Sequence, residues 1–282
     1  MTYETGIRLL AFLLVLLLCA LFEWRFPGRS WRFPRPARWR TNLSLILLNT
    51  ALTRLTLGAF AVTAALWARE QGIGLFNLVE QPQWLVVLTG VVVLDAAVWM
   101  QHWLTHRVPL LWRLHRVHHT DLELDVTTAL RFHPLEIGLS LLWKALVVVL
   151  LGLTPAAVVL FELLLSISAI FTHANLHLPD QLDRRLRWLI CTPDMHRIHH
   201  SVYQPETDSN YGFFLSVWDR LWGTLRDQPI GGVERMQLGL LDWTDPRQLT
   251  LKQLLLQPLR NVQRVRAEPP REPSPQVSER RR

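Results

Sequence analysis

The sequence predicts an all-α, polytopic membrane helical bundle of about four to five membrane segments, with a cytosolic helical cap. Three observations lead to this fold class. Of the 282 residues, 50% are hydrophobic and only 19% are charged, whereas soluble domains carry roughly 25% charged residues. The apolar residues gather in runs close to the roughly 20 residues that cross a bilayer. All eleven histidines fall in two stretches, 102–133 and 173–200.

The first three apolar runs, 7–22, 43–67 and 84–104, are expected to cross the membrane in succession. The first run is short, but it lacks the basic start and the clear cleavage site of a secretory signal. Six arginines between positions 25 and 40 follow it, and the positive-inside rule places this loop in the cytoplasm. The third span therefore ends at the cytoplasmic face, beside the first histidines.

A fourth apolar stretch, 135–172, is interrupted near its middle by Gly152 and by Thr154 followed by Pro155. A threonine cap with proline at the first helical position restarts a helix. We therefore expect a tight helical hairpin whose two ends return to the cytoplasmic face. Each arm is near the lower length limit for a full crossing, so a re-entrant hairpin is also compatible with the sequence.

Among the ionisable side chains inside these apolar runs, where an unpaired charge is costly, four fall into two pairs. Arg54 and Asp95 fall at similar depth in the predicted topology, and so do Lys144 and Glu162. We therefore expect two intramembrane ion pairs.

The chain divides into three predicted regions. Residues 1–83 hold the N-terminal spans and the arginine-rich loop, 84–230 the histidine-rich domain, and 231–282 a C-terminal cytoplasmic segment with a disordered tail from about 262. The net charge of +7 comes from arginines beside the spans, which argues for membrane topology and against nucleic-acid binding. Two distant cysteines provide neither a disulfide framework nor a CxxC metal pair.

Ten of the eleven histidines occur at spacings that place imidazoles on one helix face. Two pairs are four residues apart, and two triples share the pattern HxxHH. Pro109 and the Thr192-Pro193 pair look like the starts of the helices that carry the triples. The ten candidate metal ligands are His102, His106, His115, His118, His119, His173, His177, His196, His199 and His200.

Converging imidazoles are satisfied when they are neutral and bound to metal, so a metal site is the simplest interpretation. Ten ligands exceed one zinc site and suit two redox metals that share a small ligand such as oxygen. Ligand type alone does not select iron over zinc, copper or nickel. Two alternatives remain at this point: a zinc-dependent membrane hydrolase, although no HExxH motif is present, and a non-catalytic haem or electron-transfer membrane protein, which would leave most of the histidines unexplained.

Several other polar residues are candidates for supporting the ligands. His133 stands alone before Pro134, so a supporting or capping role is favoured over ligation. Asp95 lies seven residues before His102 on the same helical face and is placed to orient a ligand. Weaker candidates are Asp194, Asn210 and Asp219; for Asp194 a helix-cap role is favoured.

The order of these motifs resembles the fatty acid hydroxylase and sterol desaturase superfamily of membrane di-iron oxygenases. The resemblance runs from Asp95 to Asp227, about half of the chain. The motifs that carry it are DAAVWMQHWLTHR, VPLLWRLHRVHHTD, TTALRFHPLE, FTHANLHLP, TPDMHRIHHS and SNYGFFLSVWDRLWGTL. One departure is that Trp103 follows His102, where many relatives have arginine.

The resemblance implies two iron ions held by the ten histidines, with O2 as co-substrate. It implies hydroxylation or desaturation of a membrane lipid such as a fatty acyl chain or a sterol. Because no haem-binding cytochrome domain is recognised in the sequence, we expect a separate ferredoxin- or cytochrome-like protein to supply electrons. We expect an integral protein of a bacterial inner membrane, with the histidines and the C-terminus facing the cytoplasm.

Overall fold

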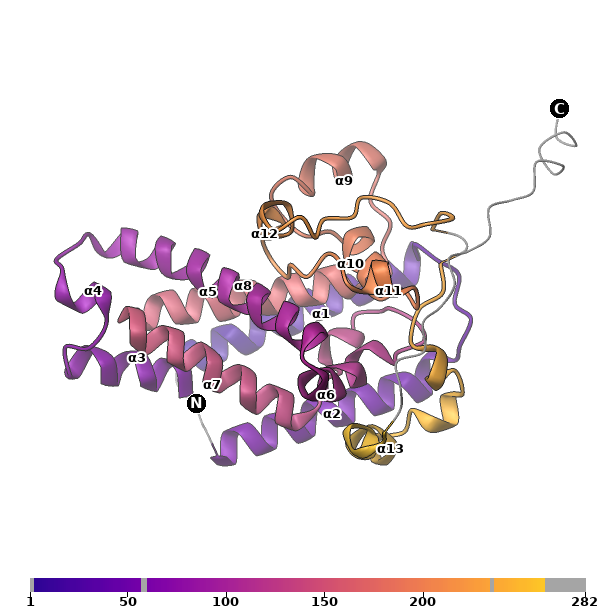
Figure 1. Ribbon diagram of the computed structural model, residues 1–282, viewed down its shortest axis with the longest axis horizontal. Helices are drawn as coiled ribbons and strands as arrows, with labels where there is room; N and C mark the ends of the chain where they lie inside the picture. Colours follow the sequence, from indigo (N-terminus) through magenta and orange to yellow (C-terminus); the bar gives the residue numbers. More distant parts are fainter. Residues whose placement is uncertain (1–2, 57–59, 234–235, 262–282) are drawn as a thin grey trace, which may run out of the picture.

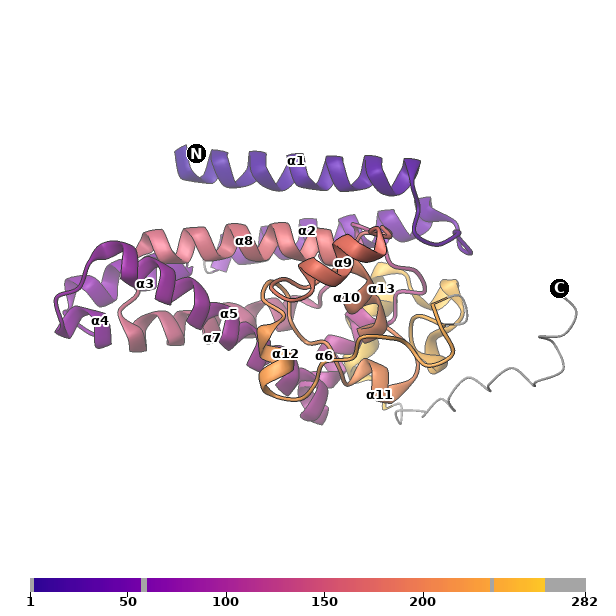
Figure 2. The same cartoon turned by 90° about the horizontal axis from the view of Figure 1, so that it is seen from above.

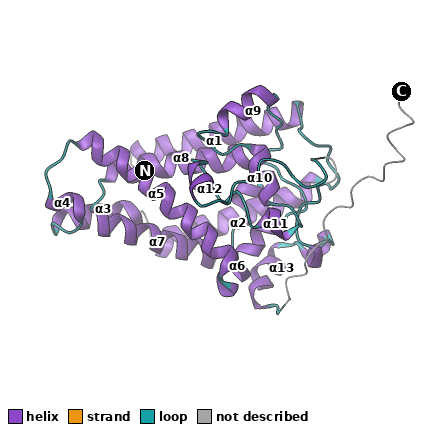
Figure 3. Cartoon of the chain, turned by 45° about the horizontal axis from the view of Figure 1, so that its top comes forward, coloured by secondary structure: helices purple, strands orange, loops and turns teal. Residues whose placement is uncertain are grey.

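The computed structural model describes residues 3–56, 60–233 and 236–261, and every regular element in these ranges is helical (Figures 1 and 3). The tail expected from about 262 lies outside the described residues. The α-helices are α1 (Tyr3–Arg25), α2 (Arg35–Thr56), α3 (Phe60–Glu70), α4 (Leu75–Leu78), α5 (Gln83–Arg107), α6 (Pro109–His119), α7 (Pro134–Leu151), α8 (Pro155–His173), α9 (Asp180–Leu186), α10 (Pro193–His199), α11 (Gln204–Thr207), α12 (Val217–Leu221) and α13 (Leu251–Leu256).

Five helical stretches of the described chain are long and apolar enough to cross a membrane. They are Gly6–Arg25, Arg35–Leu78, Gln83–Arg107, Pro134–Leu151 and Pro155–His173. The predicted runs 7–22, 43–67 and 84–104 lie within the first three of these segments. The second segment is longer than predicted and includes positions 57–59, which lie outside the described residues. The hairpin is confirmed as α7 and α8. The arginine-rich loop is shorter than expected, because α2 begins at Arg35 and carries Arg38 and Arg40 in its first turns.

The long helices run side by side, and the short helices α9–α13 gather at one end of the bundle (Figures 1 and 2). At the opposite end, Gly152 joins α7 to α8 with φ 67°, a left-handed conformation that glycine adopts readily. The side chain of Thr154 then accepts a hydrogen bond from the Ala157 amide at 3.3 Å and caps α8. The hairpin therefore returns to the end of the bundle where the histidines lie.

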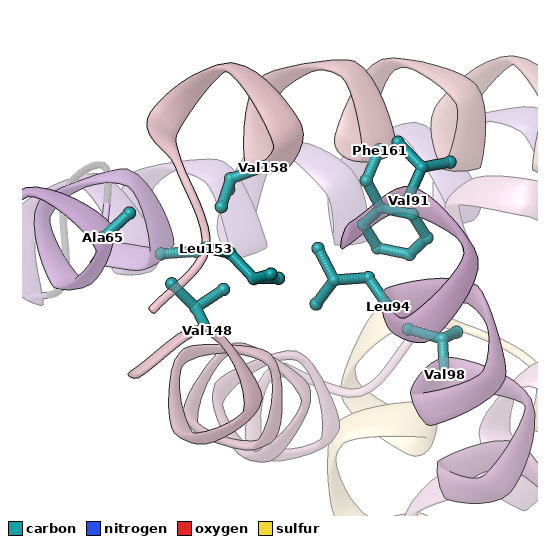
Figure 4. Close-up of a cluster of buried hydrophobic side chains, with 9 residues drawn as sticks. Ala65, Val91, Leu94, Val98, Val148, Leu153, Val158 and Phe161 are labelled. Atoms are coloured by element: carbon teal, nitrogen blue, oxygen red, sulfur yellow. The ribbon is translucent and has the colours of Figure 1, made fainter. Parts of the chain in front are cut away.

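The core of the bundle is formed by apolar side chains, mostly from α3, α5, α7 and α8 (Figure 4). Leu94 of α5, Val148 of α7 and Phe161 of α8 are at most 1% exposed. Their packing fixes α5 against the hairpin, and these helices carry His102, His106 and His173.

One of the two expected ion pairs is confirmed. Lys144 Nζ lies 3.6 Å from Glu162 Oε1, and Arg8 of α1 contacts the same carboxylate. The expected pair between Arg54 and Asp95 is wrong. Arg54 is exposed, and the Asp95 carboxylate instead accepts hydrogen bonds from the cap.

A buried polar network joins α2 to the segment that follows α6. Arg38 donates to Asp121 Oδ1 at 2.7 Å and to Asp125 Oδ2 at 2.8 Å, and Arg131 donates to the Val117 carbonyl at 2.9 Å. Burial alone would raise the pKa of Asp121, but the two arginines outweigh it and hold that pKa below its usual range. The network fixes the C-terminal end of α6, where two candidate ligands lie.

Candidate metal centre

Nine of the ten candidate histidines form two adjoining groups at the cap end of the bundle. Within each group the ring nitrogens that could bind a metal lie within 4.8 Å of one another, and all nine residues are buried. The five-histidine group contains His102, His106, His115, His119 and His199, and the four-histidine group contains His118, His173, His196 and His200. His119 and His200 stack across the boundary between the groups, with ring centroids 4.5 Å apart.

The helices explain how each HxxHH triple serves both groups. Residues four apart share a helix face, so α6 directs His115 and His119 to the five-histidine group and His118 to the other. The second triple divides the opposite way, with His196 and His200 in the four-histidine group. Pro109 and Pro193 open these two helices as expected, and Thr192 caps the second by accepting from the Met195 amide.

His177 lies outside both groups. Its expected helical pairing with His173 is wrong, because α8 ends at His173 and Ala174 adopts an extended conformation with ψ 140°. The segment turns away because Asn175 bonds to Arg29 and Glu23. The His177 side chain is 56% exposed, and its Nδ1 lies 3.0 Å from Asp194 Oδ2.

The ring nitrogens that face each other carry no proton to share. His102 Nδ1 lies 2.7 Å from the Tyr211 carbonyl, and His115 Nδ1 lies 2.6 Å from Glu136 Oε1. These oxygens only accept, so each ring carries its proton on Nδ1 and a lone pair on Nε2. The two Nε2 atoms are nevertheless 3.1 Å apart. Such a contact is repulsive between neutral rings and favourable around a cation, so the residues fit a bound metal.

The four-histidine group shows the same arrangement. His173 Nδ1 is held 2.7 Å from the Ala169 carbonyl, and its Nε2 lies 3.0 Å from the Nε2 atoms of both His118 and His196. Neither ring nitrogen of the fully buried His200 has a hydrogen-bond partner among the described residues. Buried polar atoms seldom remain unsatisfied, and a metal ion would satisfy them.

Burial keeps the rings neutral. Desolvation, and after it the proximity of other histidines, lowers the pKa of His118, His119, His196 and His200 well below its usual range. Neutral imidazole is the form that binds metal ions, so these four rings are ready to bind a metal without first losing a proton.

Known proteins are similar to this region of the chain. Residues 87–224 match the model of the fatty acid hydroxylase family. Those residues form a fatty acid hydroxylase domain. An ornithine lipid hydroxylase of Rhizobium tropici is 30% identical over 150 residues, which are 53% of this chain and 44% of that protein. No solved structure matches the chain.

Two further relatives of the fatty acid hydroxylase domain are eukaryotic. Human alkylglycerol monooxygenase is 28% identical over 189 residues, which are 63% of this chain and 41% of that protein. Sphinganine C4-monooxygenase 1 of Arabidopsis thaliana is 28% identical over 139 residues, 49% of this chain and 52% of the relative. This chain therefore spans about half the length of the relatives it matches. With its five candidate spans, the chain is an integral membrane protein.

Two of the expected supporting residues of the fatty acid hydroxylase domain, Asp219 and Asp95, accept hydrogen bonds from the cap. Asp219 accepts hydrogen bonds from the Tyr211 and Gly212 amides, both at 2.9 Å, and so positions the carbonyl that bonds His102. Asp95 accepts from the Leu215 amide and from the indole of Trp218. Both carboxylates thus fix the cap loop against α5.

The remaining candidates have structural partners. The His133 ring accepts from the Leu135 amide at 3.2 Å and caps α7. Asn210, with φ 51°, donates to the Met195 and Arg226 carbonyls, both at 2.9 Å. Asp194 contacts both His177 and Arg197. In this domain Thr192, rather than Asp194, provides the cap of α10.

Sequence reasoning missed the groups that fix the rings directly. Glu136 bonds His115, the Ser209 carbonyl lies 2.7 Å from His199 Nδ1, and Asp208 Oδ1 lies 3.5 Å from His106 Nδ1. Glu136 was identifiable in principle, since it is an acidic residue in an apolar helix three positions after His133. The carbonyl acceptors leave no signal in the side-chain pattern.

A cavity of about 170 Å³ adjoins the five-histidine group between α5, α7 and α8. His102 and His115 form part of its wall, and Ile137, Leu141 and Phe213 contribute apolar surface. No member of the four-histidine group lines it. Through this cavity, an apolar part of a ligand can reach one of the two histidine groups.

Proposed function

We propose that this chain is a membrane-bound di-iron oxygenase that uses O2 and external electrons to hydroxylate or desaturate a lipid. The observation that carries the proposal is the pair of adjoining histidine groups, each with unprotonated ring nitrogens that face one another. The names of the relatives support it, because all three are hydroxylases or monooxygenases named after a lipid.

Each histidine group would hold one iron ion. The proposed ligands are the nine grouped histidines, and His177 is left out because its ring bonds Asp194 near the surface. Bound iron would supply the reductive activation of O2 that breaking an unactivated C–H bond requires. For His102, His115 and His173 the protein keeps Nε2 aimed inward by holding Nδ1 on a fixed acceptor. For His115 that acceptor is the carboxylate of Glu136.

The lipid would approach through the cavity beside His102 and His115. The cavity wall is mostly apolar, so it can enclose a hydrocarbon segment and exclude water from the reacting carbon. Because the cavity adjoins the five-histidine group, we propose that the substrate carbon is presented to this group. The candidate substrates are acyl chains, sterols and related lipids of the surrounding membrane.

The electrons would come from a separate ferredoxin- or cytochrome-like protein that reaches the cap from the cytoplasm. The arginines at the cap end of α1 and α2 support this orientation, because basic residues flank the cytoplasmic ends of membrane spans. We propose a bacterial inner membrane as the location.

The test is oxygen transfer into lipid. Membranes containing the wild-type chain, iron and a reducing system are incubated under oxygen of a heavy isotope, and lipid extracts are analysed by mass spectrometry. We expect a lipid that gains one labelled oxygen atom, or one that loses two hydrogens in an oxygen-dependent reaction. His199→Ala should abolish the product while the protein remains inserted, whereas His133→Ala should retain it. Turnover that is supported by zinc and independent of oxygen would overturn the proposal in favour of a hydrolase.

A further inference from the structure

The cap carries an exposed apolar surface around α12. It consists of Trp188, Leu189, Leu221 and Trp222, which are 72%, 65%, 68% and 68% exposed. The two halves of this surface are joined, because the Ser216 amide donates to the Leu189 carbonyl at 3.1 Å and Arg220 lies over the ring of Trp188. We call these four residues the α12 edge. Figure 2 shows α12 at the margin of the cap beside the long helices.

The α12 edge is attached to the middle of a membrane span. The indole of Trp218 donates to Asp95 of α5 at 2.8 Å, and the ring of Trp222 stacks on Trp99 of α5 with centroids 5.9 Å apart. These contacts fix the depth of α12 relative to α5.

The length of α5 then places this edge within the bilayer. Its 25 residues from Gln83 to Arg107 extend roughly 37 Å at 1.5 Å per residue. Asp95 and Trp99 lie roughly 18 and 24 Å along it from Gln83. A hydrocarbon layer roughly 30 Å thick covers both positions, whichever end of α5 it is aligned with. The residues that contact Asp95 and Trp99 are therefore below the membrane surface.

Backbone amides around α12 are hydrogen-bonded within the protein, as an apolar environment requires, because unpaired amides are costly there. The Leu215 amide donates to Asp95, the Cys191 amide donates to the Phe214 carbonyl at 2.9 Å, and both Thr224 and Leu225 amides donate to the Asp219 carbonyl. Arg220 is also satisfied within the protein, because it donates to the Trp188 carbonyl and to Ser216. Apolar side chains face outward while polar groups are paired inward.

We propose that the α12 edge is immersed in the bilayer and that its occupant is the acyl-chain region of membrane phospholipids. The cap is then partly embedded in the membrane. Two tryptophans beside an arginine are also the composition found where proteins meet the membrane interface. This inference does not depend on the reaction proposed above.

The test measures the depth of spin labels in the full chain, reconstituted in vesicles of phosphatidylethanolamine and phosphatidylglycerol. Labels are placed at Leu189→Cys and Leu221→Cys after Cys19 and Cys191 are replaced by alanine. Leu88→Cys on the exposed face of α5 serves as the lipid reference, and Asp180→Cys on α9 as the aqueous reference. Relaxation by oxygen and by a water-soluble nickel chelate is compared at the four sites.

We expect the ratio of relaxation by oxygen to relaxation by the nickel chelate at residues 189 and 221 to equal the ratio at residue 88. A ratio equal to that at Asp180 would place the edge in water and overturn the proposal. Low relaxation by both reagents together with spin–spin coupling between chains would mean that a second copy covers the edge, which also overturns it. Retained metal content of each labelled variant verifies that it is folded.

Discussion

Replacing Glu136 by glutamine should weaken metal binding at one histidine group and leave the other unchanged. The Glu136 carboxylate accepts a hydrogen bond from His115 Nδ1 at 2.6 Å, and His115 belongs to the five-histidine group. Glutamine has nearly the same shape and still offers an oxygen acceptor, but it removes the charge. The perturbation therefore tests the electrostatic contribution of one contact to one group.

The expected size follows from the hydrogen bond. A bond to a charged acceptor stabilises by roughly 1.5–3 kcal/mol and a neutral one by roughly 0.5–1.5 kcal/mol. Glu136→Gln thus loses about 1–1.5 kcal/mol, which corresponds to roughly 5–13-fold weaker binding at the five-histidine group. Glu136→Ala removes the acceptor and should weaken binding by about 10–100-fold, as do other losses of groups that orient metal ligands.

The assay is an anaerobic titration of the metal-free, detergent-purified protein with Fe(II) against a competing chelating indicator. Ser140→Ala, one turn further along α7 and on the same cavity, is the matched control and should leave both affinities unchanged. Equal weakening of both binding events by Glu136→Gln, or no change in either, would refute the assignment of Glu136 to one group.

Three further predictions concern stability, measured by thermal unfolding in detergent. Arg38→Met removes the cation that bonds two buried carboxylates, so it should destabilise the fold by about 3–5 kcal/mol, whereas Arg40→Met at a neighbouring position outside this network should have little effect. Similar transitions for the two variants would contradict this. Gly152→Ala should destabilise the hairpin by about 1–2 kcal/mol because φ is 67° and a Cβ would meet Asn77 Nδ2 at 2.6 Å. Gly138→Ala, with no atom within 4 Å of its Cβ, should be neutral or stabilising. A larger loss of stability in Gly138→Ala than in Gly152→Ala would be evidence against the left-handed turn at Gly152. The metal-free protein should lose stability as the pH falls below about 6.5. The histidines of the unfolded chain then take up protons, whereas burial holds the pKa of His118 and His196 lower in the folded protein. An unfolding temperature that does not change between neutral and mildly acidic pH would contradict that prediction.

Much of the fold follows from local chemistry in the sequence. Apolar runs of the right length predicted the spans, and Gly152 with Thr154 and Pro155 predicted the hairpin turn. The same logic predicted the helices that open at Pro109 and Pro193. These features depend on residues close in sequence, so a single chain is sufficient to identify them.

The features that the sequence did not predict depend on tertiary contacts. The partner of Asp95 proved to be the cap loop rather than Arg54, because depth in the membrane does not specify which helix faces are adjacent. His177 has the spacing of a helical pair with His173, but the helix ends between them. The division of each HxxHH triple between two groups likewise depends on how α6 packs against α10, which spacing alone does not define.

The central claim is that two histidine groups each hold a metal ion, and the most direct test is to count metals in paired variants. The wild-type protein, prepared with iron available, is compared by elemental analysis with His102→Ala/His199→Ala from the five-histidine group and His118→Ala/His196→Ala from the four-histidine group. His133→Ala, which removes a buried histidine outside both groups, is the control. We predict two metal ions per chain for the wild type and the control, and one for each paired variant. A wild type that binds a single ion, or paired variants that retain both, would contradict the account.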